Sequence, residues 1–319
     1  MNMRMVLLSF FLIASLGCSP EFARYNVVTD LRILALSADK PDVFDGETAV
    51  FSALVTDDNA SYEWSWCPLP AGSADAFECQ LNDAQLEALL AGALGPDAFD
   101  VPDLILGTTP TVSFLNEMSP EVGRRLCDSL VQFLPEGASV PQCLEDYFRY
   151  TIKLKVTSED GSKTVVGVRW LNVILNPDVV VNTNPEFTEV EIGLLNDASQ
   201  NTNLVLSDGT TPIVRPESYR LVANAEANQS QEYFETNRGA EPSATSEDLV
   251  LSWFSEVGEI DRIRTSFLEG ERPLEQLNNN EWVLTEEDAT GSTRLWMVMR
   301  DERGGTSWQM RTLMVGGAQ

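Results

Sequence analysis

The stretch Ser61-Tyr62-Glu63-Trp64-Ser65-Trp66-Cys67 decides the fold class of this chain. Its aromatic residues Tyr62, Trp64 and Trp66 alternate with charged or small residues, so an extended strand would carry all three on one face. Short patterns of this kind recur along most of the sequence and are separated by turns rich in Gly, Pro and Asp. Many short strands at such spacing are typical of a β-sandwich, and we therefore predict a mainly β protein.

The sequence repeats this organisation twice. Each half contains a strand with a central tryptophan, Trp64 in the first and Trp253 in the second. Each half also ends in a predicted hairpin whose turn combines acidic residues with glycine, at 158–161 and at 301–304. We therefore predict two Ig-like β-sandwich domains in tandem. The expected strands are residues 31–35, 48–56, 61–67, 147–156, 165–175, 187–192, 219–225, 248–254, 281–284, 294–300 and 307–315.

Between about residues 68 and 146 the pattern becomes helical. Leucines and an alanine at i, i+3, i+4 and i+7 predict a helix over 83–94, with Asn82 or Asp83 as its N-cap. A second helix is expected to open at Ser119-Pro120-Glu121, because proline is favoured at the first helical position. We therefore expect the first sandwich to carry an α-helical insertion.

The chain contains five cysteines, and four of them lie in or beside this insertion. Cys67, Cys79, Cys127 and Cys143 form an even set, which favours disulfides in an exported protein. Four cysteines allow three pairings, and we predict the nearest-neighbour pairing, Cys67–Cys79 and Cys127–Cys143. A zinc site of four thiolates is the alternative, but the sequence has no Cys-x-x-Cys pair. Disulfides would stabilise an insertion too small for a core of its own.

Residues 1–17 have the layout of a secretory signal peptide. Arg4 precedes the apolar run Met5–Ile13, and small and apolar residues then lead to Cys18. The Gly-Cys junction resembles a bacterial lipobox, which implies that Cys18 is acylated and attaches the chain to the membrane. The alternatives are a plain secreted protein and a membrane-spanning anchor, although an apolar stretch of about 13 residues is short of the roughly 20 needed. Ser19 follows the cysteine, and the resemblance then favours the outer membrane, on its periplasmic or surface face.

The composition excludes several classes of function. There are 49 acidic and 21 basic residues, so the net charge is −28, and it becomes −29 if residues 1–17, with their single arginine, are removed. Such a charge argues against nucleic acid as a partner and against binding to an anionic membrane through a basic patch. The chain has no histidine, which excludes Ser-His-Asp and Cys-His catalysis and histidine-ligated metals. No phosphate-binding loop, nucleophile elbow or EF-hand loop occurs either. We therefore predict no catalytic residue, no cofactor and no metal site.

Two kinds of residue remain as weak candidates for a site. The acidic turns Asp57-Asp58-Asn59, Glu286-Glu287-Asp288 and Asp301-Glu302 could hold calcium, although solvated turns use the same residues. The tryptophans could stack on sugars, but most lie in predicted strands, where core packing is the commoner use. We expect Trp296 and Trp308, which flank the final hairpin, to be less buried than the others.

Four motifs resemble known bacterial sequences. Lys40-Pro41-Asp42 followed by Asp45-Gly46-Glu47-Thr48 resembles the first turn of bacterial Ig-like modules. The lipobox, Trp64-Ser65-Trp66-Cys67-Pro68 and the closing turn 300–305 (Arg-Asp-Glu-Arg-Gly-Gly) are similar to those of uncharacterised surface lipoproteins of predatory and myxobacteria-like deltaproteobacteria. The resemblance implies a fold and a location and transfers no catalytic residue.

These observations predict the following organisation: a signal peptide at 1–17, a tether at 18–28, a first sandwich at 29–176, a linker at 177–185 and a second sandwich at 186–319. The expected function is that of a lipid-anchored envelope protein with a structural or binding role and no catalytic activity. Its partner would be an unknown envelope protein or polysaccharide. A carbohydrate-binding or carbohydrate-active surface protein and a calcium-dependent adhesin are the alternatives.

Overall fold

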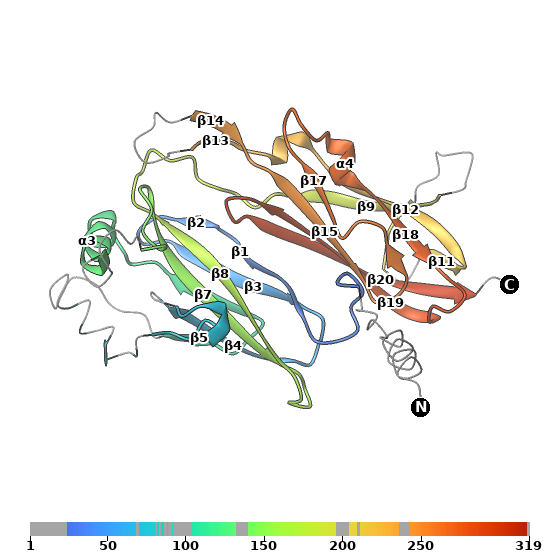
Figure 1. The fold of residues 1–319 in the computed structure, drawn as a ribbon, viewed down its shortest axis with the longest axis horizontal. Coiled ribbons are helices and arrows are strands. Elements are labelled where there is room, and N and C mark those ends of the chain that lie inside the picture. Colours follow the sequence, from blue (N-terminus) through green and yellow to red (C-terminus); the bar gives the residue numbers. More distant parts are fainter. Residues whose placement is uncertain are drawn as a thin grey trace, which may run out of the picture.

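The chain forms two β-sandwiches, which lie end to end along the long axis of the computed structural model (Figure 1). The chain is mainly β and forms two Ig-like sandwiches, as predicted. The structure describes residues 24–67, 70–80, 82, 84–85, 88, 91, 104–131, 140–195, 204–208, 211–235 and 243–317.

The first sandwich consists of two facing sheets. One has the strand order β1-β3-β6 (Ile33–Ala38, Thr48–Val55, Thr111–Leu115). The other has the order β2-β8-β7-β4-β5 (Asp42–Val43, Thr164–Ile174, Tyr147–Thr157, Ser61–Cys67, Ile105–Gly107). The predicted hairpin is β7–β8, which pairs from Tyr147 opposite Ile174 to Thr157 opposite Thr164.

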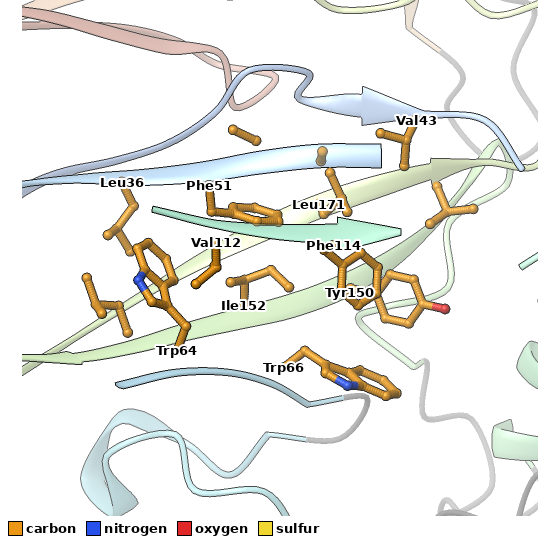
Figure 2. Packing of buried hydrophobic residues seen from close by; sticks show 14 of the residues in the cluster. Leu36, Val43, Phe51, Trp64, Trp66, Val112, Phe114, Tyr150, Ile152 and Leu171 are labelled. Carbon is orange, nitrogen blue, oxygen red and sulfur yellow. The ribbon is translucent and has the colours of Figure 1, made fainter. Parts of the chain in front are cut away.

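Aromatic side chains fill the space between these sheets (Figure 2). Trp64 is fully buried, and its indole N–H donates a hydrogen bond to the carbonyl of Thr109 at 2.9 Å. Trp66 meets Tyr150 edge to face, with the ring centroids 5.1 Å apart. Aromatic rings of this size contribute large buried areas, so the alternating Trp-Ser-Trp strand supplies much of the core.

The segment predicted to be a helical insertion also contains strands. Its helix α3 (Pro120–Val131) begins as predicted, and the Ser119 hydroxyl accepts the backbone N–H of Val122 at 3.3 Å. In the other predicted helix, residues 84, 85, 88 and 91 are helical, and the remainder of 83–94 lies outside the described residues. Between the two helices, however, β5 and β6 return to the sandwich and pair with β4 and β3. The insertion is therefore two separate excursions from the sheets.

The two disulfides of the structure fasten these excursions. Cys67, at the end of β4, is joined to Cys79, and Cys127 of α3 is joined to Cys143, which lies just before β7. This is the nearest-neighbour pairing. Each bond ties a segment with little core of its own to the end of a central strand.

The second sandwich repeats the plan of the first. One sheet has the order β10-β9-β12-β18-β16 (Leu204–Val205, Phe187–Leu194, Glu217–Ala225, Asn279–Leu284, Glu259–Ile260). The other has the order β11-β20-β19-β15-β17 (Pro212–Arg215, Thr306–Gly317, Gly291–Asp301, Leu249–Ser255, Arg264–Phe267). A short hairpin, β13–β14 (Glu232–Glu235, Ser243–Ser246), and a helix, α4 (Leu274–Asn278), complete it.

Strand pairing shows that the internal repeat extends to topology. In each sandwich a short strand runs parallel to the last strand, β2 with β8 and β11 with β20. In each, the tryptophan-bearing strand, β4 or β15, pairs with the first strand of the closing hairpin. The other sheet of each sandwich also corresponds. The order β1-β3-β6 in the first sandwich matches β9-β12-β18 in the middle of the sheet of the second. Paired sheets connected in this way are the arrangement of an Ig-like fold.

Candidate functional site

The acidic turns singled out in the sequence take part in local structure. Asp57 accepts the backbone N–H of Asn59 at 2.9 Å, and Asp58 lies 3.3 Å from the guanidinium of Arg294. Asp288 accepts backbone N–H groups of its own turn and of a neighbouring one. Within the described part of the chain, no group of three or more His, Cys, Asp or Glu side chains could hold a metal ion.

The lipidation candidate Cys18 and the signal segment 1–17 lie outside the described residues. No helix among the residues described is long and apolar enough to cross a membrane. The end of the predicted tether, however, is part of the fold. The backbone N–H of Val28 donates to Ser255 at 2.8 Å, and Ser255 donates back to Asn26 at 2.9 Å. The chain is therefore attached to β15 of the second sandwich before it enters the first.

The two sandwiches meet across an apolar cluster. Leu34, Ala35 and Leu54 of the first pack against Phe254, Trp296 and Val298 of the second, with Val28 and the half-buried Trp308 beside them. The expectation that Trp296 is less buried than the other tryptophans is wrong, because its exposed fraction is 0%. An isolated sandwich would present this face of β19 to water, and here the neighbouring sandwich covers it.

A set of buried polar residues, which we call the junction network, lies beside this cluster and consists of Asp42, Asn182, Glu247, Asp301 and Arg303. Asp42, of the first sandwich, accepts the backbone N–H of Asn182 at 2.8 Å and lies 3.5 Å from Arg303. Arg303 is also 3.1 Å from Glu247, and the side chains of both acids are almost completely inaccessible to solvent. Asn182 belongs to the predicted linker, yet it is only 2% exposed. One arginine thus pairs with buried carboxylates from both sandwiches.

The junction network brings together two motifs that are about 260 residues apart in sequence. Asp42 ends the Lys-Pro-Asp motif, and Arg303 belongs to the closing turn at 300–305. Within that turn, Asp301 accepts the backbone N–H groups of Gly304 and Gly305, each at 2.6 Å. The sequence marked both motifs as turns, but it gave no indication that they meet.

Three more arginines join the sandwiches by donating to backbone carbonyls. Arg300 donates to Leu34 at 2.6 Å and Arg294 donates to Thr56 at 2.9 Å, both from the second sandwich to the first. Arg169, of the first sandwich, donates to the carbonyl of Gly304 and to the Thr306 hydroxyl at 3.1 Å. A guanidinium has five N–H donors, which suits it to satisfy several acceptors in a buried interface.

Burial changes the proton affinity of the junction network. Desolvation raises the pKa of Glu247 from 4.5 to about 7, with the nearby Asp301 charge adding to the effect. Desolvation also raises the pKa of Asp42 and of Asp301. It lowers the pKa of Arg169 to about 10, so this guanidinium stays charged at neutral pH. The carboxyl of Glu247 therefore changes its protonation near neutral pH.

A groove of about 600 Å³ opens beside the junction network, with walls from both sandwiches. The first sandwich supplies Tyr147 and Arg149 from β7, and the second supplies Tyr233 and Phe234 from β13 together with Arg303. The β13–β14 hairpin projects from the second sandwich toward the first in Figure 1. Phe234 is 63% exposed, so most of its ring faces solvent at the wall of the groove.

Another exposed aromatic residue lies next to the groove. Trp170 of β8 is 53% exposed, and the guanidinium of Arg149 lies 4.6 Å from its ring centroid. Trp170 pairs with Thr151 and Asn172 pairs with Arg149, so these side chains share the outer face of the sheet. From the sequence, Trp170 is one of seven tryptophans that could stack on sugars, with core packing the commoner use, and no signal distinguishes Phe234. Each residue fits the alternating pattern of its own strand, β8 or β13, so the sequence carries no signal that its side chain is exposed.

Comparisons with known proteins do not identify a family. No protein-family model matches the chain, and no curated protein matches it. Among solved structures, the Ig1 and Ig2 domains of DIP-gamma align at 11% identity and a TM-score of 0.19, with 90% of this chain and 98% of that chain covered. The tandem V-type regions of VCBP3, a v-region-containing chitin binding protein, align at 9% identity and a TM-score of 0.27, covering 89% and 99%. The Bacteroides ovatus mixed-linkage glucan protein SGBP-B aligns at 10% identity and a TM-score of 0.20, covering 90% and 48%. Similarities this low carry no argument about function, and the Ig-like assignment rests on the strand order of the two sandwiches.

Proposed function

We propose that this chain is a non-enzymatic envelope protein, anchored by lipid at Cys18, whose two fixed Ig-like sandwiches bind a partner outside the cytoplasm. The junction between the sandwiches is the observation that supports this most directly. Domains joined by a flexible linker move relative to each other unless their interface is extensive. Here an apolar cluster, the junction network and the attached residues 26–28 all cross that interface. A fixed arrangement benefits binding because less conformational entropy is lost when the partner binds.

The attachment of the tether also supports a position close to the membrane. Cys18 and Arg24 are six residues apart in the sequence. A fully extended chain of that length reaches at most about 21 Å. Acylated Cys18 would then hold Arg24, which pairs with Glu259 of the second sandwich, within about that distance of the lipid surface.

Lipidation can be tested with the full chain expressed in a diderm bacterium fed an alkyne analogue of palmitate. The wild type is expected to incorporate the label and to sediment with membranes. Cys18→Ala is expected to remain unlabelled and to appear in the soluble periplasmic fraction. Equal labelling of both proteins, or an unlabelled wild type, would contradict the anchor.

Binding can be tested with the exported Cys18→Ala protein and isolated cell envelopes of the organism that makes it. We expect saturable binding that heating the protein beforehand abolishes. Envelopes treated with a protease or with periodate would distinguish a protein partner from a polysaccharide. Non-saturable binding would refute the proposal, and so would turnover of an envelope polymer by the purified protein.

A further inference from the structure

We propose that the groove between the sandwiches binds a neutral oligosaccharide, with Phe234 in its lining and Trp170, which lies against the lining residue Arg149, as stacking surfaces. This inference rests on the proposed binding function and specifies its ligand. The groove has the size of ligand sites in proteins, and its walls combine aromatic faces with a few polar groups.

Two exposed aromatic rings favour a sugar as the ligand. Phe234 and Trp170 lie in regular strands and are 63% and 53% exposed, while the tryptophans of the two cores are buried. Leaving such rings in water forgoes the free energy that burial would provide. The C–H face of a pyranose ring can cover an aromatic ring, so a sugar would bury both surfaces without needing a deep cavity.

The polar groups of the groove favour a ligand without charge. Carboxylates from Glu145, Asp178 and Glu302 line it together with the guanidinium groups of Arg149 and Arg303. An anion would meet these carboxylates and a chain whose net charge is −28. A cation would meet the two arginines. Sugar hydroxyls both donate and accept hydrogen bonds, so a neutral polyol can use both kinds of group.

The walls of the groove are held in place before any ligand binds. The Tyr233 hydroxyl donates to Glu302 at 2.8 Å, and the guanidinium of Arg303 lies 4.9 Å from the Tyr233 ring. Arg303 is itself fixed by Asp42 and Glu247. On the opposite wall, Arg149 donates to Asn172 at 3.0 Å and lies against Trp170. Asn172 in turn donates to Asp42 at 2.8 Å, so the junction network connects the residues on both sides of the groove.

The experiment uses the full-length exported Cys18→Ala protein and titrates it with neutral hexaoses. The probes are β-1,4-linked glucose, β-1,4-linked N-acetylglucosamine, β-1,4-linked mannose and α-1,4-linked glucose, and binding is followed by calorimetry and tryptophan fluorescence. At least one hexaose is expected to bind, with a Kd that changes less than twofold between 50 and 500 mM salt. In the same protein, Phe234→Ala and Trp170→Ala are expected to weaken binding at least tenfold, and Trp170→Phe to retain most of it.

Phe44→Ala is the matched control, because Phe44 is also a partly exposed phenylalanine (38%) but lies outside the groove. It is expected to bind as the unmodified protein does. The proposal is overturned if none of the hexaoses binds, or if Phe234→Ala and Trp170→Ala bind as tightly as the control. It is also overturned if a polyuronate binds better than the neutral sugars, or if a random peptide library competes for the groove. Saturable binding to envelopes that Phe234→Ala leaves intact would remove the groove proposal and leave the proposed function standing.

Discussion

Replacing Arg303 by methionine tests the role of the junction network directly. The substitution keeps much of the aliphatic volume and removes the charge that faces Asp42 and Glu247. The side chains of these two acids are 1% and 0% exposed, so neither can recover its hydration by a small movement. Removing one partner of a buried ion pair typically costs about 3–5 kcal/mol. We expect Arg303→Met to lower the free energy of unfolding by that amount at pH 8.

The loss of stability in Arg303→Met depends on pH through Glu247. The pKa of Glu247 is 4.5 in the unfolded chain and about 7 in the folded protein. The folded state therefore binds the proton more tightly, and this group stabilises the fold as the pH falls from about 8 to about 5. For the wild type the gain from Glu247 between pH 8 and pH 5.5 amounts to about 2 kcal/mol. Without Arg303 the carboxyls are protonated more readily, so the loss in Arg303→Met should shrink by about 1 kcal/mol or more at pH 5.5.

Urea unfolding followed by tryptophan fluorescence at both pH values measures these quantities. Arg272→Met is the matched control, because Arg272 is exposed and its effect should stay within about 0.5 kcal/mol. Adding Glu247→Gln to Arg303→Met should recover part of the stability at pH 8, since one unpaired carboxylate is then neutral. A loss of less than about 1 kcal/mol in Arg303→Met at pH 8, or an equal loss at both pH values, would contradict this role of Arg303.

Three further substitutions test other parts of the structure. Trp296→Ala should cost about 3–5 kcal/mol, because it leaves a cavity between the sandwiches, and should split a single calorimetric transition into two; one unchanged transition would argue against coupled domains. Replacing Cys127 and Cys143 by serine opens a loop with a sequence separation of 16 and should lower the free energy of unfolding by about 3 kcal/mol in urea titrations, whereas an unchanged midpoint would mean that the bond is not needed. Gly305→Ala would place a Cβ 1.9 Å from an Asp301 carboxylate oxygen, so a loss of about 1–3 kcal/mol is expected, and a Tm equal to that of the wild type would show that the turn is not close-packed.

The sequence predicted the elements whose side chains alternate or recur clearly. The Trp-Ser-Trp strand, the two closing hairpins and the start of α3 are all where their patterns place them. The predicted N-cap is also present, since Asn82 and Gln85 accept each other's backbone N–H groups at 2.9 and 3.0 Å. Period and capping depend on neighbours within a few residues, which is why a single sequence contains them.

The sequence did not predict the short strands β2 and β11. Pairing with a distant strand defines them more than their own residues do. β2 has two residues and β11 has four, and each is defined by a parallel partner more than 100 positions later in the sequence. β6 is a different case, since its Thr-Val-Ser-Phe-Leu sequence does alternate, with Val112 and Phe114 buried. Helical signals flank this pattern on both sides, and they favour a helical interpretation of the whole segment.

The sequence by itself therefore determined the fold class, the repeated plan of two sandwiches and the central strands of each. It also indicated two local disulfides, because the four cysteines lie in or beside a small insertion and each has another cysteine nearby in the sequence. Only the tertiary structure decided what lies between the sandwiches. Trp296 is buried, Arg303 pairs with Asp42 and Glu247, and Phe234 and Tyr147 line one groove, because two separate surfaces are brought into contact. Such contacts join residues far apart along the chain, and no local period records them.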